Sequence, residues 1–216
     1  MSSSVIAPAI LAENADQYKE QVDKITGLVE RVHIDISDGE FAPTLTVGIP
    51  ELWAPEGWMI DIHAMVNDVA EYVPKLIALR PHMIIIHAEA TGDVKTALMQ
   101  IRQAGIMAGL ALLKPTVPRT VEELIKIADH VMIFSGELGR FGGTASLMQL
   151  EKIRLIKAIN PSVEIGWDGG VAVDNAYSLV QGGVTVLNVG GVIQKSSDPR
   201  TIFSRLQQEI NKTSVL

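Results

Sequence analysis

The sequence predicts a single (β/α)8 TIM barrel over residues 1–216. Short runs rich in valine and isoleucine alternate with longer amphipathic stretches, which is typical of repeated βα units around a parallel sheet. Eight such units are present, and no G-x-G-x-x-G motif follows the first strand run, so a closed barrel is favoured over a doubly wound open sheet. The length also fits one domain with one core.

The expected elements alternate along the chain. The expected strands are Val5–Leu11, Val32–Ile36, Met59–His63, Met83–His87, Ala108–Leu112, His130–Phe134, Glu164–Trp167 and Val184–Val189. The expected helices are Ala15–Leu28, Val69–Leu79, Asp93–Ala104, Thr120–Ala128, Ser146–Asn160, Val173–Gln181 and Pro199–Asn211. Gly105 is expected to end a helix as a C-terminal glycine, and Asp198 before Pro199 is expected to cap the last one. Apolar residues on these outer helices fit either internal packing or a subunit interface, and a homo-oligomer is expected.

Composition and charge exclude several partners. The formal net charge is -7 and the pI is about 5.2, and no lysine or arginine run offsets that charge, so nucleic acid is not an expected partner. Because the chain has no cysteine, a metal would have to be bound by histidines and carboxylates. The first residues lack the basic start of a signal peptide, and no stretch reaches membrane-spanning length. We therefore expect a soluble cytoplasmic protein that does not bind membranes.

Four polar residues at three expected strand ends suggest a metal site, because chemistry in these barrels gathers at the carboxyl ends of the strands. His33 and Asp35 lie two residues apart in one strand and point to the same side. His63 ends the next strand, two residues after Asp61, and Asp168 closes the seventh. Two imidazoles and two carboxylates would bind one divalent ion, Zn²⁺, Fe²⁺, Mn²⁺ or Co²⁺. Any one of them alone is more often a hydrogen-bonded cap, so the prediction depends on all four.

Glycine pairs follow the last three strands: Gly142-Gly143, Gly169-Gly170 and Gly190-Gly191. Glycine lets backbone N–H groups approach an anion, and the loops after strands 7 and 8 are the usual phosphate position in these barrels. Each pair alone is more often a tight turn. The loop from Ser135 to Thr144 contains Arg140 and is a candidate lid over a substrate.

The sequence resembles the ribulose-phosphate 3-epimerase family from Ala7 to Gly191. The motifs that carry the resemblance are His33-Ile-Asp-Ile-Ser-Asp-Gly-Glu-Phe-Ala-Pro43, Asp61-Ile-His-Ala-Met65, His87-Ala-Glu-Ala90, Phe141-Gly-Gly143 and Asp168-Gly-Gly170. The resemblance implies a barrel of the ribulose-phosphate-binding type and a small phosphorylated ketose as substrate. It also implies that the metal ligands are His33, Asp35, His63 and Asp168. Of these, Asp35 and Asp168 would also be the acid and base of the reaction. Met65 would line the reacting centre, and we assign His87 no ligand role.

The implied reaction converts D-ribulose 5-phosphate to D-xylulose 5-phosphate, a step of the pentose phosphate pathway. Epimerisation next to a ketone removes a proton from one face and returns one to the other, through an enediolate that a divalent ion stabilises as a Lewis acid. Asp35 and Asp168 can stand on opposite faces, one ionised and one protonated. His82 and His130 lie near strand starts at the other end of the barrel, where surface or capping roles are expected.

Several positions near the site depart from the family pattern, whereas the metal set does not. The departures are Ala9 for a serine, Ser37 and Ser135 for methionines, Thr44 for an asparagine, and Gly191 for a serine or threonine. A wetter, reshaped pocket is expected, and a hexulose 6-phosphate such as allulose 6-phosphate is an alternative substrate. Arg140 is a candidate to replace the hydroxyl lost at Gly191.

Two further classes of protein are alternatives. One is a non-catalytic barrel that binds a sugar phosphate, and retention of both Asp35 and Asp168 favours the enzyme over it. The other is a metal-free decarboxylase on the same scaffold, but the Asp-x-Lys-x-x-Asp array that it needs is absent from the run Asp35-Ile-Ser-Asp38.

Overall fold

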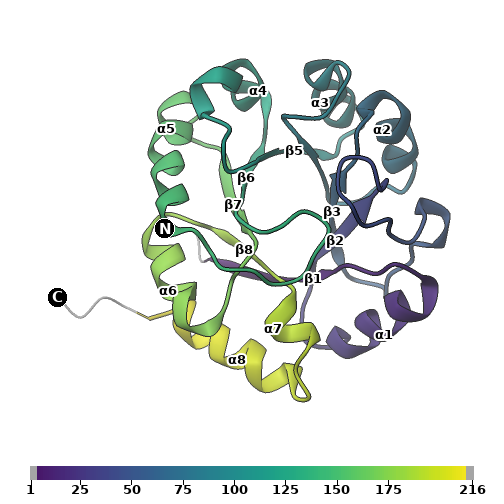
Figure 1. Cartoon of the computed structure of the whole chain (residues 1–216), viewed down its shortest axis with the longest axis vertical. Helices are drawn as coiled ribbons and strands as arrows, with labels where there is room; N and C mark the ends of the chain where they lie inside the picture. The colour runs from purple at the N-terminus through teal and green to yellow at the C-terminus, as the bar shows by residue number, and fades with distance from the viewer. Residues whose placement is uncertain (1–3, 213–216) are drawn as a thin grey trace.

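The computed structural model describes residues 4–212, and within them eight parallel strands close into a barrel in chain order, as predicted. The strands are β1 Val5–Ile10, β2 Arg31–Ser37, β3 Met59–Met65, β4 Met83–His87, β5 Met107–Leu112, β6 His130–Phe134, β7 Glu164–Asp168 and β8 Val186–Val189. The helices are α1 Ala15–Ile25, α2 Val69–Ala78, α3 Val94–Gln103, α4 Glu122–Ile127, α5 Glu151–Ile159, α6 Val173–Gln181, α7 Gly191–Gln194 and α8 Pro199–Ile210. Figure 1 shows these helices as a ring around the strands. The predicted domain bounds of 1 and 216 lie outside the described residues.

Alternating side chains along the strands build two apolar layers. Ile34, Ile62 and Ile84 belong to the large cluster of buried residues that includes the inner faces of the helices. Their strand neighbours point the other way, into the barrel, where Ile85 and Met132 belong to a smaller apolar cluster. The barrel is therefore a packed core, and a ligand can enter only at its ends.

Most element ends follow local signals that the sequence carries. The first helix ends at Ile25, earlier than predicted, because Thr26 leaves the helix and Gly27 takes a positive φ of 75°. Asp198 accepts a hydrogen bond from the Thr201 N–H, which confirms it as the cap of α8. Gly105 has a φ of 77°, as expected of a glycine that ends a helix.

Three helical segments differ from the prediction. The expected helices at Thr120–Ala128 and Ser146–Asn160 each begin with a 3-10 turn, Pro118–Val121 and Leu147–Leu150. Helix α7 was not expected, because its four residues are too short to show a helical period. It begins at Gly191 and so places the start of a helix at the barrel mouth.

A buried ionic network fills the barrel at the amino ends of the strands. The Arg31 guanidinium donates to Asp61 through Nε (2.6 Å) and to Glu164 through Nη1 and Nη2 (2.9 and 2.8 Å). His82 joins Asp61 and His130 joins Glu164, at 2.8 and 2.7 Å. The expected surface role of His130 is wrong, because its side chain is fully buried as part of this network.

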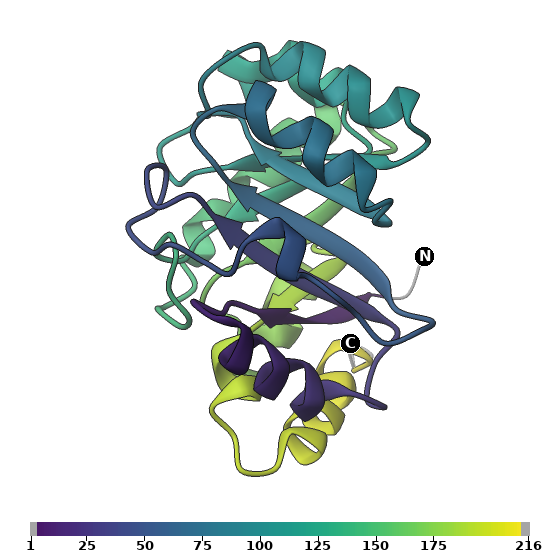
Figure 2. The ribbon, with the colours of Figure 1, turned by 90° about the vertical axis from the view of Figure 1, so that its right-hand side faces the viewer.

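The other end of the barrel carries the long loops. In Figure 2 the strand arrows all point to one side, and the loops that follow β2 and β6 lie on that side. The loop after β6 crosses the front of the barrel in Figure 1. Within residues 4–212, no helix combines the length and hydropathy that crossing a bilayer requires.

Candidate active site

Four side chains at the carboxyl ends of three strands converge on one point. His33 and Asp35 come from β2, His63 from β3, where it pairs in register with Asp35, and Asp168 ends β7. Asp35 Oδ1 lies 2.7 Å from His63 Nδ1 and 3.3 Å from His33 Nε2. Asp168 Oδ2 lies 3.7 and 3.8 Å from the same two nitrogens. One donor atom from each residue lies within 4.8 Å of the others, so the structure brings the predicted ligands together.

The donor set fits a divalent cation. His33 and His63 are fully buried, and Asp35 is 7% exposed. His33 Nε2 is buried and makes no hydrogen bond to any described residue, although it points at the two carboxylates. A buried nitrogen without a partner is costly, and a metal ion bound to its lone pair would satisfy it. The cluster could therefore hold one ion through two nitrogens and two oxygens.

The two carboxyl groups differ in acidity. Burial alone would raise the pKa of Asp35, but the imidazoles of His33 and His63 hold it well below its usual range. Burial, together with the adjacent charge of Asp35, raises the pKa of Asp168 to about 6. Burial would lower the pKa of His33, yet the contact with Asp35 and the negative charges of Asp168 and Asp61 together outweigh it and the pKa is raised. An ionised Asp35 beside an Asp168 that takes up a proton more easily is the pairing that a base and an acid require.

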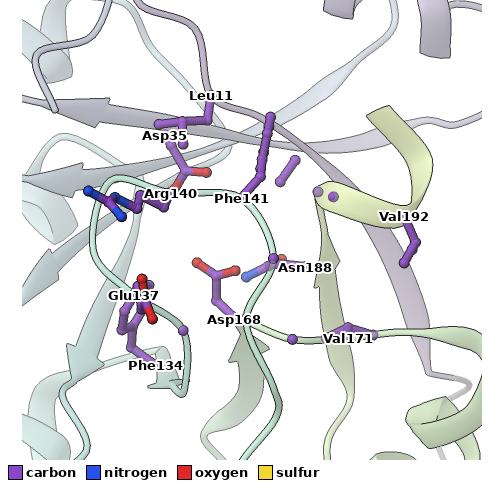
Figure 3. A pocket seen from close by; sticks show the side chains of 18 of the residues that line it. Leu11, Asp35, Phe134, Glu137, Arg140, Phe141, Asp168, Val171, Asn188 and Val192 are labelled. Carbon is purple, nitrogen blue, oxygen red and sulfur yellow. The ribbon is translucent and has the colours of Figure 1, made fainter. Parts of the chain in front are cut away.

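A cavity of about 350 Å³ opens directly over this cluster, and its volume suits a small metabolite. Asp35, Met65 and Asp168 line its floor, whereas His33 and His63 lie beneath it. Figure 3 shows the carboxyl groups of Asp35 and Asp168 pointing into the cavity from opposite sides. A substrate in the cavity would therefore lie between two carboxyl groups.

All three predicted glycine pairs line the same cavity. Gly169 and Gly170 have positive φ angles of 97° and 72°, and a Cβ on Gly169 would lie 2.0 Å from the backbone nitrogen of Gly136. No side chain fits there, because the loop after β7 packs directly on the loop after β6. Gly142 and Gly143 also have positive φ, but a Cβ on either would meet nothing within 4 Å, and both residues line the cavity.

The positions that depart from the family pattern fall into two groups. Ala9 and Gly191 line the cavity, together with the exposed Arg140. The described residues that line it do not include Ser37, Thr44 or Ser135. Ser135 instead accepts a hydrogen bond from the Ser146 N–H at 2.7 Å and so fastens the loop after β6. The expected wetter pocket depended on Ser37 and Ser135, which do not line the cavity, whereas the two changed positions that do line it, Ala9 and Gly191, each lack a hydroxyl.

Sequence reasoning did not single out three polar residues of the cavity, Glu137, Asn188 and Lys195. Asn188 pairs with Asp168 in the sheet, is 2% exposed, and its Oδ1 has no hydrogen-bond partner among the described residues. Its only sequence signal is a polar residue inside the apolar run of β8. Lys195 follows the short helix α7, which no periodicity could reveal.

Comparisons of the sequence with known proteins all match one family. The model of the ribulose-phosphate 3 epimerase family matches residues 5–194. The chain is 30% identical to the ribulose-phosphate 3-epimerase of Aquifex aeolicus, over 90% of this chain and 91% of that one. It is 28% identical to the chloroplastic ribulose-5-phosphate-3-epimerase of Arabidopsis thaliana, over 91% of this chain and 74% of that one.

Solved structures with a similar fold share little sequence with this chain. KGPDC from Streptococcus mutans superposes with a TM-score of 0.74 at 13% identity, covering 97% of this chain and 98% of that one. The 3-hexulose-6-phosphate synthase of Salmonella typhimurium gives 0.69 at 15% identity, covering 95% and 97%. These likenesses support the barrel fold alone.

Proposed function

The chain belongs to the ribulose-phosphate 3-epimerase family and is a carbohydrate epimerase that acts on a ketose phosphate, and we propose that it inverts C3 of that substrate with Asp35 and Asp168 as the proton-transfer pair. The observation that carries the proposal is the pair of carboxyl groups that point into the cavity from opposite sides. Inversion needs one group on each face of the reacting carbon. The non-catalytic alternative gives no reason for that arrangement.

We propose that His33 Nε2, Asp35, His63 Nδ1 and Asp168 hold one divalent ion. The fit of the unpartnered His33 nitrogen and the mixed nitrogen and oxygen donors supports this assignment. When bound, the ion supplies positive charge next to the substrate oxygens that become negative during the reaction. Its identity among Zn²⁺, Fe²⁺, Mn²⁺ and Co²⁺ stays open, because all four accept these donors.

The proton transfer itself follows from the two carboxyl groups. In one direction, ionised Asp35 removes the proton from C3, and the electron pair of that C–H bond forms a C2–C3 double bond while the π electrons of the C2 carbonyl move onto its oxygen, to return when C3 is reprotonated. Protonated Asp168 then delivers its proton to C3 from the opposite face, so the configuration inverts and the two groups exchange roles. The opposite sides from which the two groups point into the cavity support this pairing of base and acid.

The phosphate group would lie at the glycine-lined side of the cavity. The backbone N–H groups of Gly142 and Gly143 are candidate donors, since both glycines line the cavity. Arg140 and Lys195 are the cationic side chains among the residues that line it. They supply the positive charge that compensates for the hydroxyl missing at Gly191.

The choice between ribulose 5-phosphate and a hexulose 6-phosphate depends on the middle of the cavity. Asn188 lies there, and its unpaired Oδ1 would accept a hydrogen bond from a sugar hydroxyl. Ala9, from the neighbouring strand β1, presents only a methyl group. We propose ribulose 5-phosphate as the substrate, with allulose 6-phosphate as the second candidate, because the missing hydroxyl at Ala9 leaves room for a changed sugar.

The test is exchange of the C3 proton in deuterated water. Metal-replete protein would be incubated with ribulose 5-phosphate, allulose 6-phosphate and, as a control, a ketose without phosphate. We expect deuterium at C3 of one phosphorylated sugar and an inverted product. Absence of exchange with every ketose phosphate would overturn the proposed reaction, and exchange only with the hexulose phosphate would reassign the substrate.

A further inference from the structure

A third buried histidine stands directly behind the candidate metal site. His87 ends β4, is fully buried, and stacks against the ring of Phe41 with 4.6 Å between ring centroids. Its Nε2 lies 2.8 Å from His63 Nε2, and its Nδ1 lies 3.3 Å from Glu89 Oε2. His87 therefore joins a ligand histidine to a carboxylate, although it offers no atom to the metal cluster itself.

The orientation of Glu89 is fixed from its other side. Glu89 Oε1 accepts the Leu113 N–H at 3.0 Å and also accepts the hydroxyl of Thr116. These two donors leave Oε2 as the oxygen that faces His87. A carboxylate oxygen only accepts hydrogen bonds, so the hydrogen between the two residues belongs to His87 Nδ1.

This assignment determines the hydrogen positions on both rings. A neutral imidazole carries one hydrogen, so His87 with a hydrogen on Nδ1 presents a lone pair at Nε2. The contact of 2.8 Å between the two Nε2 atoms is a hydrogen bond only if His63 supplies the hydrogen. With an ion bound, His63 then presents a lone pair to it at Nδ1, in place of the hydrogen bond that Nδ1 donates to Asp35 Oδ1 at 2.7 Å without the ion.

We propose that Glu89 and His87 are positioning residues that hold His63 in the tautomer whose Nδ1 is free to bind the divalent ion. This inference depends on the proposed metal site and deepens it. The arrangement is specific to His63, because the Nδ1 atom of the other ligand histidine, His33, has no hydrogen-bond partner among the described residues. Outer contacts of this kind set the orientation and basicity of a metal-binding imidazole.

Glu89→Gln tests the proposal with almost no change of shape. Because the Leu113 N–H and the Thr116 hydroxyl need an acceptor, the glutamine oxygen replaces Oε1 and the NH₂ group faces His87. His87 Nδ1 must then accept, so its Nε2 carries the hydrogen and His63 Nε2 must accept in turn. The hydrogen of His63 moves to Nδ1, where it competes with the metal.

Two measurements test the positions of these hydrogens and their effect on metal binding without an assay of enzyme activity. Nitrogen-15 spectra of the imidazoles are tractable, since the chain has five histidines, and they report which nitrogen carries the hydrogen in the metal-free and Zn²⁺-loaded protein. We expect Nδ1–H on His87 and Nε2–H on His63 in the Zn²⁺-loaded wild type, and Nε2–H on His87 with the hydrogen of His63 on Nδ1 in metal-free Glu89→Gln. Zn²⁺ affinity, measured by competition with a chelator, is expected to fall by about 10–100-fold in the variant.

Glu123→Gln is the matched control, because Glu123 is an exposed partner of Lys126 on α4. It is expected to leave the tautomers and the Zn²⁺ affinity unchanged. An Nδ1–H tautomer of His63 in the Zn²⁺-loaded wild type, or Zn²⁺ binding by Glu89→Gln within twofold of wild type, would overturn the proposal. Failure of the wild type to bind Zn²⁺ would instead overturn the metal site, while its tautomers would still test the hydrogen-bond chain.

Discussion

The substitution Glu164→Gln tests whether the ionic network at the amino ends of the strands stabilises the fold without affecting the site at their carboxyl ends. Glu164 accepts three hydrogen bonds in the ionic network, two from Arg31 and one from His130. A glutamine has one acceptor oxygen and one donor NH₂ group, so at least one N–H must face another N–H. The Arg31 side chain is 7% exposed, which leaves its charge with little water to replace the lost partner.

The expected loss of stability follows from that burial. Removing one partner of a buried ion pair costs about 3–5 kcal/mol, and the lower end applies because Arg31 keeps Asp61, so we expect a loss of about 3 kcal/mol. At roughly 2–4 °C per kcal/mol for a domain of this size, Tm falls by about 6–12 °C. Metal binding and epimerisation should be unchanged, since the network lies at the opposite end of the strands.

The same residue gives a pH dependence. Burial alone would raise the pKa of Glu164, but hydrogen bonds from Arg31 and His130 hold it well below its usual range. A lowered pKa stabilises the fold above the unfolded value of about 4.3, and this stability is lost as the pH falls below it. The difference in Tm between wild type and Glu164→Gln should therefore be complete at pH 7 and shrink below about pH 4.3.

Thermal unfolding followed by circular dichroism measures these effects, with Glu123→Gln as the exposed control, for which no measurable change in Tm is expected. A fall in Tm of under 2 °C for Glu164→Gln would refute the reasoning from burial. Loss of activity in a fully folded Glu164→Gln would refute the separation of the two ends.

Three further predictions concern the mouth of the barrel. Asp168→Asn should lower formation of the C3-inverted product by about 10²–10⁴-fold with little change in Tm, and near-normal inversion would refute the two-carboxyl mechanism. Lys195→Ala should raise KM by about tenfold and leave kcat nearly unchanged in steady-state assays, whereas Lys212→Ala, which is remote from the cavity, should change neither. A fall in kcat alone would contradict phosphate binding by Lys195. Gly169→Ala should lower Tm by more than 5 °C, because its Cβ would lie 2.0 Å from the backbone of the neighbouring loop. The control Gly57→Ala, at a φ of 87° with nothing near its Cβ, should cost only about 1–2 kcal/mol of stability. Equal losses of stability in the two variants would contradict the loop contact.

The sequence predicted the repeating part of the molecule well. Valine and isoleucine runs mark the strands, because a parallel sheet buried on both faces needs apolar side chains on both. The spacing of His33 and Asp35 placed both on one face, and the strand-end rule placed His63 and Asp168 at the same mouth. Local patterns of this kind predict structure because each depends on a single strand or turn.

The features that sequence reasoning missed depend on closure of the barrel. Arg31 meets Glu164 across the barrel from 133 positions away, and no local pattern links the two residues. His87 approaches His63 because β3 and β4 are neighbours, yet only the structure shows that their Nε2 atoms touch. Lys195 enters the cavity because four residues form the short helix α7 before it. Contacts between distant strands and loops require three-dimensional structure.

The most direct test of the central claim is the position of the metal. Crystals grown with Mn²⁺ would be measured for anomalous scattering. We expect one strong peak per chain, between the four donor atoms of His33, Asp35, His63 and Asp168. If crystals grown at a saturating concentration of Mn²⁺ show no anomalous peak between these residues, or a peak only elsewhere, the account is contradicted.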